Sequence, residues 1–267
     1  RTCWHGASSK WFQDAKALGR NISEKAIIKN MDDFELFVSQ TGEALKGAKE
    51  IYFAGGEPLV TEEHYLLLEW LVKNKVTDLT LRYNTNFSIL KFKNYDILDY
   101  WSQFKKVEVL ASMDATEELG EIIRKEFDWS LFLENREKIR GFENIIFKLA
   151  PTISILNLAH LPELYKTGIE KNIIKPANYY INILERPFYY NIKAFQIDKK
   201  KEIEEEFTLF YDWCKQNSIP NSVIDSFKEC IAFMNQEQLS EKYWNQFLKE
   251  TEVLDELRGE DWLILHT

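Results

Sequence analysis

The sequence predicts an α/β fold in which short apolar strands alternate with amphipathic helices. Three observations support this prediction. Strand-like and helix-like patterns alternate from residue 24 to about residue 185, glycine or polar residues close the strands, and strand patterns stop after Pro187. Such alternation is typical of a parallel sheet with helices outside it, arranged either as a barrel or as an open doubly wound sheet.

The first elements can be justified from their residues. Apolar positions with helical spacing predict a helix within residues 24–46, and residues 50–54 read as a short buried strand closed by two glycines. Thr61 is expected to cap the next helix, because acidic residues occupy its first turn. Further strands are predicted at residues 78–83, 106–111, 144–155 and 179–184, and further helices near residues 95–104, 117–125, 129–140 and 161–171.

The end of the chain differs in composition from the rest. After Pro187 only helices are predicted, at residues 199–216, 223–235 and 239–256. The chain has 267 residues, which is long for one domain and short for two. We therefore expect one region over residues 1–197 and a helical region over residues 198–267.

Charge and composition exclude several classes of protein. The net charge is −9, and the short basic run at residues 199–201 precedes three glutamates, as on a solvated helix surface. Free nucleic acid is therefore not an expected partner. No apolar run approaches the ~20 residues that span a membrane. Three scattered cysteines without a signal peptide point to a reducing cytoplasm.

The strongest chemical signal is the segment Tyr-Phe-Ala-Gly-Gly-Glu-Pro at residues 52–58. It follows a predicted strand, and its two glycines let the backbone turn and approach a ligand closely. Glu57 adds a carboxylate at the strand end. Taken alone, this segment would be read as an ordinary strand-to-helix turn with a surface glutamate.

Other segments give it a context. The opening Arg-Thr-Cys-Trp-His resembles the third-cysteine end of the C-x3-C-x2-C signature of radical S-adenosylmethionine enzymes, with Cys3 as the last cysteine. Gly-Gly-Glu-Pro resembles that family's motif for the methionine amino group. Residues 83–87 resemble its Thr-Asn-Gly segment, and residues 111–115 with Arg124 resemble its Ser-x-Asp and downstream arginine. Four motifs in the right order, each at a predicted strand end, make the resemblance specific.

The resemblance carries expectations about the fold. It implies a partial (β/α)6 TIM-like barrel with a helical C-terminal extension, whose first strand and two other cluster cysteines precede Arg1. Residues 254–262 resemble the ending of the twitch or SPASM-like subgroup. An auxiliary cluster is not expected, because Cys214 and Cys230 lie in predicted helices and read as buried core residues.

The resemblance also implies cofactors and partners. Cys3 would help to hold a 4Fe–4S cluster, which would bind S-adenosylmethionine and cleave it reductively. The resulting 5′-deoxyadenosyl radical would take hydrogen from an unknown peptide or small molecule. A reductase, a flavodoxin or a ferredoxin would donate the electron. No side chain is assigned a catalytic role.

The resemblance places the remaining candidates around the cofactor. Gly55, Gly56 and Glu57 would face the methionine ammonium, and Thr85 and Asn86 would line the pocket. In this chain Phe87 stands where the family usually has glycine.

Ser112 and Asp114 would bind ribose hydroxyls, and Arg124 would pair with the methionine carboxylate. Asp114 reads equally well as a helix cap, and Arg124 as a surface residue of a helix. Gly55, Thr85, Ser112 and Thr152 are expected at one rim of the sheet.

Two other functions remain open from the sequence. The chain would serve as a degenerate family member that binds S-adenosylmethionine or a partner without radical chemistry, if the upstream cysteines are lacking. Alternatively, it would be an unrelated α/β-barrel hydrolase or lyase that uses Glu57 and Asp114 as acid and base.

Overall fold

The fold is described from a computed structural model, which describes residues 9–22 and 33–262. These residues form two compact units. The sheet unit contains residues 9–22, 33–112 and 130–148, and the helical unit contains residues 113–129 and 149–262. Cys3, the predicted cluster ligand, lies outside the described residues.

The sheet unit is built on a four-stranded parallel sheet in the order β1-β2-β5-β6. The strands are β1 Glu50–Phe53, β2 Thr80–Thr85, β5 Lys106–Ala111 and β6 Ile145–Leu149. The register places Arg82 between Tyr52 and Glu108. The predicted α/β fold with a parallel sheet is thus confirmed, and the strands expected near residues 50, 80 and 106 are present.

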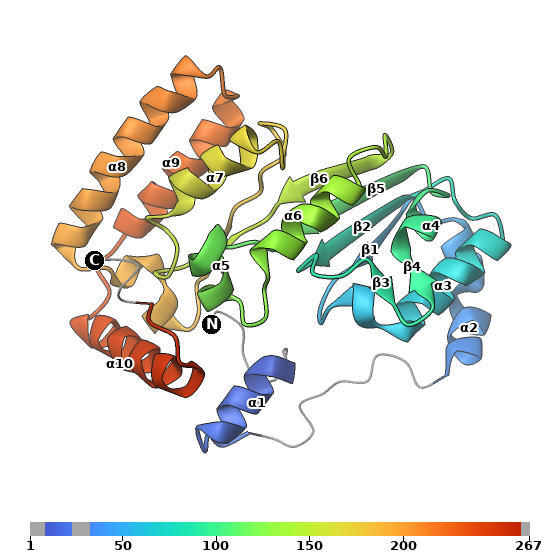
Figure 1. The fold of residues 1–267 in the computed structure, drawn as a ribbon, viewed down its shortest axis with the longest axis horizontal. Helices are drawn as coiled ribbons and strands as arrows, with labels where there is room; N and C mark the ends of the chain where they lie inside the picture. The colour runs from blue at the N-terminus through green and yellow to red at the C-terminus, as the bar shows by residue number, and fades with distance from the viewer. Residues whose placement is uncertain (1–8, 23–32, 263–267) are drawn as a thin grey trace. The chain divides into compact units, whose positions relative to one another are not determined.

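Helices α3 Glu62–Lys73, α4 Ile97–Trp101 and α6 Trp129–Lys138 lie against one face of this sheet (Figure 1). The sheet unit also contains α1 Ser9–Ala17 and α2 Phe34–Lys46. The contacts that carry the packing are between Tyr83 and Trp101 of α4, with ring centroids 5.3 Å apart, and between Phe132 of α6 and Phe147, 6.1 Å apart. α2 packs on α3, where Gly42 meets the ring of Trp70.

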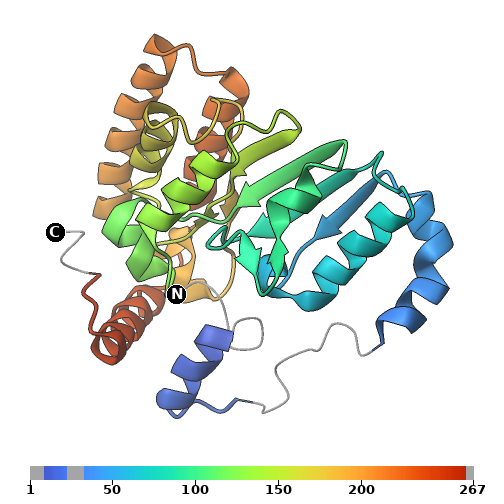
Figure 2. The same cartoon turned by 45° about the vertical axis from the view of Figure 1, so that its right-hand side comes forward.

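The two faces of the sheet differ because strand side chains alternate. On β2, Leu81, Tyr83 and Thr85 are buried, whereas Arg82 and Asn84 are half-buried. The first set faces α3, α4 and α6, whose arrangement is also visible in Figure 2. The second set gives the sheet a polar face.

A hairpin replaces the start of the helix expected at residues 95–104. Strands β3 Lys91–Phe92 and β4 Tyr95–Asp96 pair antiparallel around Lys93, whose φ is +53°. The helix begins only at Ile97, because the Asp96 carboxylate accepts a hydrogen bond from Leu98 N at 3.0 Å and so caps it.

The helical unit contains two short strands and most of the remaining helices. The strands, β7 Thr152–Ile153 and β8 Asn182–Ile183, pair in parallel. The helices are α5 Glu117–Ile123, α7 Leu161–Glu170, α8 Ile197–Gln216, α9 Asn221–Asn235 and α10 Glu241–Arg258. The single strand expected over residues 144–155 is wrong: it is divided at Pro151, whose ring nitrogen has no hydrogen to donate to a strand ladder.

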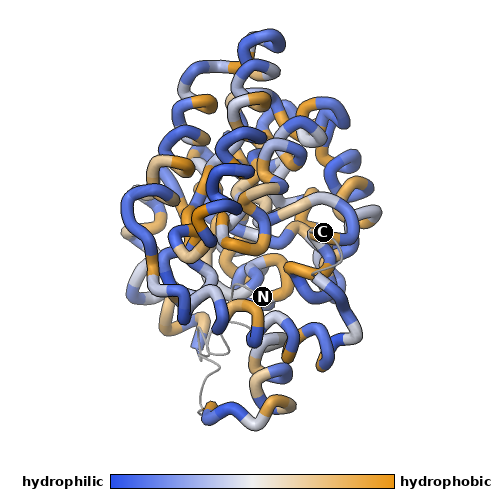
Figure 3. The backbone as a smooth tube through the Cα atoms, turned by 90° about the vertical axis from the view of Figure 1, so that its left-hand side faces the viewer, coloured by the Kyte–Doolittle hydropathy of each residue, from blue (hydrophilic) through white to orange (hydrophobic). Residues whose placement is uncertain are grey.

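The C-terminal helices are amphipathic, as their alternating colours in Figure 3 show. The prediction of helices beyond residue 198 is confirmed. Cys214 on α8 and Cys230 on α9 are both fully buried, as predicted, and burial raises the pKa of these thiols to about 11 and about 12. Both thiols are therefore protonated at neutral pH and act as small apolar residues.

Lys200 corrects one sequence-based interpretation. Lys199 and Lys201 pair with acidic neighbours on the surface of α8, as expected. Lys200 between them is only 7% exposed, and its Nζ donates to the carbonyl oxygen of Met234 at 2.8 Å. Lys200 thereby provides a hydrogen-bond donor for the Met234 carbonyl. This carbonyl lies in the last turn of α9 and has no partner within that helix.

A membrane span was not expected from the sequence. Across the described ranges, the structure contains no helix that is both long and apolar enough to cross a bilayer.

Candidate functional site

The Gly-Gly-Glu-Pro turn follows β1 at the carboxyl edge of the sheet. Gly55 and Gly56 have φ values of +82° and +53°, in the left-handed region that favours glycine. A Cβ atom added to either glycine would meet no atom within 4 Å. Glycine is therefore needed here for backbone conformation, and the turn presents an open backbone surface.

The Glu57 carboxylate ties this turn to the end of β2. Its Oε1 accepts from Thr85 Oγ1 at 2.6 Å and from Leu59 N at 3.3 Å, and its Oε2 accepts from Asn86 N at 2.7 Å. These donors are uncharged, and Thr85 is one of the residues that the sequence placed at the rim. We call Glu57, Thr85 and Asn86 the Glu57 cluster.

Phe87 follows the Glu57 cluster in an unusual conformation. Its φ is +56°, and its N–H donates to Thr85 Oγ1 at 2.9 Å. The ring is fully buried and contacts Phe147 at a centroid distance of 4.9 Å. Asn135 Nδ2 donates to the carbonyl oxygens of Phe87 and Ser88 at 3.2 and 3.0 Å, so the turn is fixed from both sides.

A buried histidine lies behind the cluster on the covered face of the sheet. His64 Nε2 is 3.0 Å from the hydroxyl of Tyr83, and its ring packs edge-on against Phe53. Burial lowers the pKa of His64 to about 3, so the ring is neutral at physiological pH. Sequence reasoning missed this pair, because His64 belongs to no recognisable motif and Tyr83 was noted only as the first residue of the segment that resembles Thr-Asn-Gly.

Ser112 lies at the same edge of the sheet as the Glu57 cluster. Its N–H donates to the carbonyl oxygen of Thr85 at 2.8 Å, which continues the pairing between β2 and β5. Its side chain is half-buried. Within the sheet unit, the carboxyl edge therefore brings together six predicted residues. These are Gly55, Gly56, Glu57, Thr85, Asn86 and Ser112.

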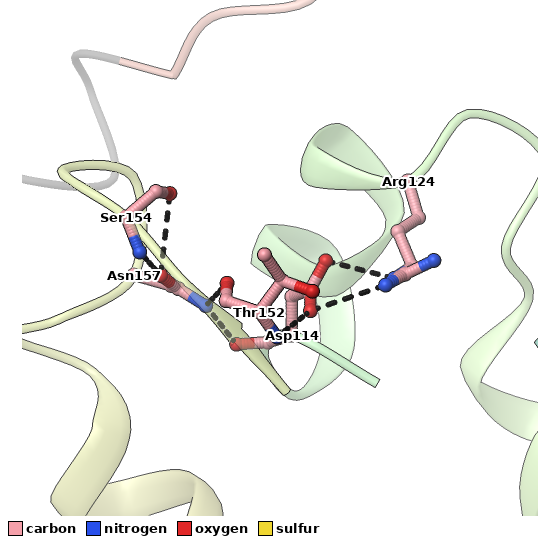
Figure 4. Close-up of polar contacts among 5 residues, drawn as sticks. All are labelled: Asp114, Arg124, Thr152, Ser154 and Asn157. Atoms are coloured by element: carbon pink, nitrogen blue, oxygen red, sulfur yellow. Dashed lines mark hydrogen bonds and ion pairs between the residues drawn. The ribbon is translucent and has the colours of Figure 1, made fainter. Parts of the chain in front are cut away.

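Three other predicted residues meet in the helical unit (Figure 4). Asp114 is 1% exposed, and its Oδ2 lies 2.8 Å from Arg124 Nε. The contact between Nε and Oδ2 is close enough for an ion pair but is not aligned as a hydrogen bond. Arg124 also donates a hydrogen bond from Nη2 to Asp114 Oδ1 at 3.2 Å. Thr152 N also donates to Oδ1, at 2.7 Å. We call these residues the Asp114 cluster.

Asn157 supports the Asp114 cluster and was missed by sequence reasoning. Its Nδ2 donates to the carbonyl oxygens of Asp114 and Thr152 at 2.8 and 3.1 Å, and its Oδ1 accepts from Ser154 N at 2.8 Å. Ser154 and Asn157 are buried. Two polar residues inside an otherwise apolar run were the available signal, because such residues need internal partners when buried.

The helix-cap interpretation of Asp114 is wrong. The N-cap of α5 is Thr116, whose Oγ1 lies 2.8 Å from His160 Nε2. His160 Nδ1 lies 3.3 Å from Glu163 Oε2. Burial lowers the pKa of His160, while the nearby carboxylates of Glu163 and Glu117 oppose that shift. In a neutral His160 that carries its proton on Nδ1, Nε2 is free to accept from Thr116, and the Nδ1 proton is on the side of the Glu163 carboxylate.

Comparisons with known proteins add no relative. The chain matches no protein-family model, and no curated protein matches it at a significant level. The geometry of the two clusters and the motif resemblance therefore carry the functional argument.

The C-terminal motif has a structural role in the described residues. α10 ends at Arg258, and Gly259 follows with a φ of +64°, in the left-handed conformation common after helices. Trp262 is then anchored by hydrogen bonds from its N to Asp255 Oδ2 at 3.1 Å and from its Nε1 to the carbonyl oxygen of Leu156 at 3.3 Å. The motif stops α10 at Arg258 and fixes Trp262.

A metal site in a protein needs several His, Cys, Asp or Glu side chains grouped together. Among residues 9–22 and 33–262, no three His, Cys, Asp or Glu side chains are grouped to hold a metal ion. The predicted cluster ligand, Cys3, is outside these ranges.

Proposed function

We propose that this chain is the greater part of a radical S-adenosylmethionine enzyme. In this proposal the Gly55–Gly56 turn binds the methionine ammonium through its open backbone, and Glu57 orients that turn and supplies a negative charge. Thr85, Asn86 and Ser112 line the same edge of the sheet, and Cys3 ligates a 4Fe–4S cluster. Bound there, the cluster would supply the electron that cleaves S-adenosylmethionine, and the protein would hold the cofactor away from water.

The observation that carries the proposal is the bond between two motifs that are distant in sequence. Glu57 of Gly-Gly-Glu-Pro accepts a hydrogen bond from Thr85, 28 residues away, in the segment matched to Thr-Asn-Gly. For two unrelated surface turns, no such connection would be expected. Parallel strands bring their carboxyl ends to one edge, which is where α/β folds bind ligands.

The backbone at Phe87 adds support. The family usually has glycine at this position, and the backbone has the left-handed conformation that glycine adopts without strain. For a phenylalanine this conformation costs about 1–3 kcal/mol. Burial of the ring against Phe147 offsets that cost. At this position the chain therefore has a backbone conformation that glycine adopts readily, although the residue is phenylalanine.

The partial barrel belongs to the same proposal. β1 lies at the edge of the described sheet, and Tyr52 on this strand is 51% exposed. Exposed edge strands accept further strands readily, because their backbone groups are unpaired on one side. The proposal assigns that position to a further strand of the barrel and assigns α8, α9 and α10 to the twitch-like extension.

The Asp114 cluster takes modified roles in this proposal. The Asp114 carboxylate is buried and holds both Arg124 and the Thr152 N–H, so it acts through these groups rather than on a ligand directly. The Arg124 side chain is 26% exposed. Its remaining N–H groups are suited to binding a carboxylate.

The acid–base rival is the weaker alternative. A general acid or base must reach the proton that it transfers. Asp114 is 1% exposed and already engaged with Arg124 and Thr152. The degenerate-binder rival differs from the proposal only in the cluster, so experiments must separate binding from cleavage.

The binding step is tested by calorimetric titration of S-adenosylmethionine into the 267-residue chain. We expect saturable binding that Glu57→Gln weakens by about 1.5–3 kcal/mol, the value of a hydrogen bond to a charged group. Glu43→Gln is the matched control, because its side chain is 90% exposed on α2 and the charge change is the same. Equal affinities of all three proteins would contradict the role of Glu57.

The radical step is tested by anaerobic reconstitution with iron and sulfide. Cys3 alone cannot hold a four-iron cluster, and Cys214 and Cys230 are buried in helices more than two hundred residues away in the sequence. The 267-residue chain should therefore form no cluster and should release no 5′-deoxyadenosine with dithionite. A chain extended upstream to include the two predicted cysteines should do both, and Cys3→Ala should abolish both. An extended chain that binds S-adenosylmethionine but remains free of iron would favour the degenerate binder.

A further inference from the structure

The polar face of the sheet carries a group of charged residues that belongs to neither the Glu57 cluster nor the Asp114 cluster. Glu108 on β5 has a side chain only 12% exposed, and three cations surround it. Lys106 Nζ lies 2.5 Å from its Oε1 and Lys148 Nζ lies 3.6 Å from its Oε2. Arg82 is its direct neighbour across the β2–β5 ladder. The hydrogen bond from Lys106 lowers the pKa of Glu108, and the charges of Lys148 and Arg82 add to this effect.

The charges of this cluster do not cancel. One carboxylate stands against Arg82, Lys106 and Lys148, and Glu50, the other acid that the four described strands place on this face, is exposed at the start of β1. Among these strand residues the excess is positive, although the chain as a whole has a net charge of −9. Half-buried cations in excess are costly unless an anion compensates them.

Two buried polar atoms on the same face have no hydrogen-bond partner among the described residues. Arg82 Nε and Asn84 Oδ1 are buried, and neither has a hydrogen-bond partner in the described part of the chain. Both residues belong to β2 and point to the same face, roughly 6.6 Å apart along the strand. One atom is a donor and the other an acceptor, so a single ligand must offer both kinds of group to satisfy them.

The surroundings define the class of that ligand. Arg82 lies over the half-exposed ring of Tyr52, with its guanidinium carbon 5.5 Å from the ring centroid, which gives a flat platform beside the positive charge. A guanidinium binds a carboxylate through paired hydrogen bonds, and an amide oxygen accepts from an N–H group. Asn84 immediately precedes Thr85 of the Glu57 cluster, so a ligand here would reach toward the Gly55–Gly56 turn.

We propose that this face binds a carboxylate joined to an amide N–H, as at the carboxyl end of a peptide. Arg82 anchors the carboxylate, Asn84 accepts from the N–H, and Lys148 supplies further positive charge. The inference names a substrate class for the proposed radical enzyme and rests on that function only in calling the ligand a substrate. The site itself does not depend on that function, because it rests on the excess of cations and on the two buried polar atoms that have no hydrogen-bond partner among the described residues.

Calorimetric titration with N-acetylglycylglycine, without S-adenosylmethionine or iron, tests the site. The matched probe is N-acetylglycylglycinamide, which lacks only the carboxylate charge. We expect the acid to bind saturably and the amide at least about tenfold more weakly. Arg82→Gln should weaken binding of the acid by at least about tenfold, Arg82→Lys by less, and Asn84→Ala by a few-fold.

Lys91→Gln is the control variant, because it removes one positive charge from an exposed position on β3 outside the polar face. Its affinity for the acid should equal that of the wild type. Near-ultraviolet circular dichroism would show that each variant is folded, and Arg82→Lys provides the test of the anchor if Arg82→Gln does not fold.

Three results would overturn the inference. In the first, the acid does not bind to the folded wild-type chain. In the second, Arg82→Gln binds the acid as tightly as the wild type does. In the third, inorganic phosphate binds as tightly as the acid and depends on Arg82 to the same extent. Titration of S-adenosylmethionine into the same variants separates the two proposals. An equal loss of S-adenosylmethionine affinity in Arg82→Gln would also overturn the inference, by assigning the face to the cofactor. Probe binding without S-adenosylmethionine binding would reject the proposed function and keep the site.

Discussion

The Glu57 cluster and the Asp114 cluster show two different ways of holding an acidic residue that follows a strand. Glu57 is half-buried and accepts hydrogen bonds from the uncharged donors Thr85 Oγ1 and Asn86 N. Asp114 is 1% exposed and is paired with the charged side chain of Arg124. Both residues looked alike in the sequence, as single carboxylates near the end of a strand.

The difference is one of charge compensation as well as burial. A half-buried carboxylate beside an open glycine turn can add its charge to a ligand site. A buried carboxylate must first be neutralised by its own chain, and the ion pair then fixes two segments. The comparison teaches that the acidic residue in a motif need not be the group that meets the ligand.

The largest expected effect tests the buried cluster. Asp114→Ala would leave the Arg124 guanidinium and the Thr152 N–H without their partner. We expect the free energy of unfolding to fall by about 3 kcal/mol, measured by equilibrium denaturation in urea. Asp114→Asn keeps the shape and one acceptor, so it should cost less. A loss below ~1 kcal/mol for Asp114→Ala would remove the distinction between the clusters.

The next effect concerns pH and the histidine behind the Glu57 cluster. The folded pKa of His64 is about 3, below the ordinary value of 6.5, so the unfolded chain binds the proton more readily. Stability from this group is complete above pH 6.5 and decreases as the pH falls toward 3. Between pH 7.5 and pH 5 the loss should be about 2 kcal/mol.

His64→Phe provides the comparison for this measurement, because a phenyl ring suits the neighbouring rings of Phe53 and Tyr83. Its free energy of unfolding should vary less with pH over the same window. Identical pH dependence in both proteins would mean that folding does not lower the pKa of His64.

A smaller effect is expected when the charge of the Glu57 cluster is removed. Glu57→Gln introduces an amide donor among residues that already donate, so at least one hydrogen bond is lost. We expect stability to fall by about 1–2 kcal/mol in urea denaturation, less than for Asp114→Ala. Glu43→Gln should change it by less than ~0.5 kcal/mol. A larger loss for Glu57→Gln than for Asp114→Ala would reverse the comparison.

The smallest effect concerns the acid beside the Asp114 cluster. Glu163 is 65% exposed, and its carboxylate favours the charged form of His160. Glu163→Gln should change stability by less than ~0.5 kcal/mol and should lower the pKa of His160 further, as followed by proton NMR titration of the ring. An unchanged His160 titration would show that the two side chains do not interact in solution.

Much of the local structure was predictable from the sequence. The apolar periodicity of β2 and of the C-terminal helices, and the burial of Cys214 and Cys230, follow from interactions within a few residues. The glycine turn was predictable for the same reason, because positive φ values at Gly55 and Gly56 are local requirements. In each case the pattern and its cause lie in the same short segment.

The tertiary structure alone decided which polar groups became partners. Asp114 meets Thr152, Lys200 meets the carbonyl of Met234, and Arg82 lies beside Glu108, each across a long stretch of chain. A buried donor or acceptor must be satisfied, but the sequence near it does not say by which group. That choice depends on which strands and helices pack together. The sequence therefore determined where along the chain the charged residues occur, and the fold determined which groups they contact.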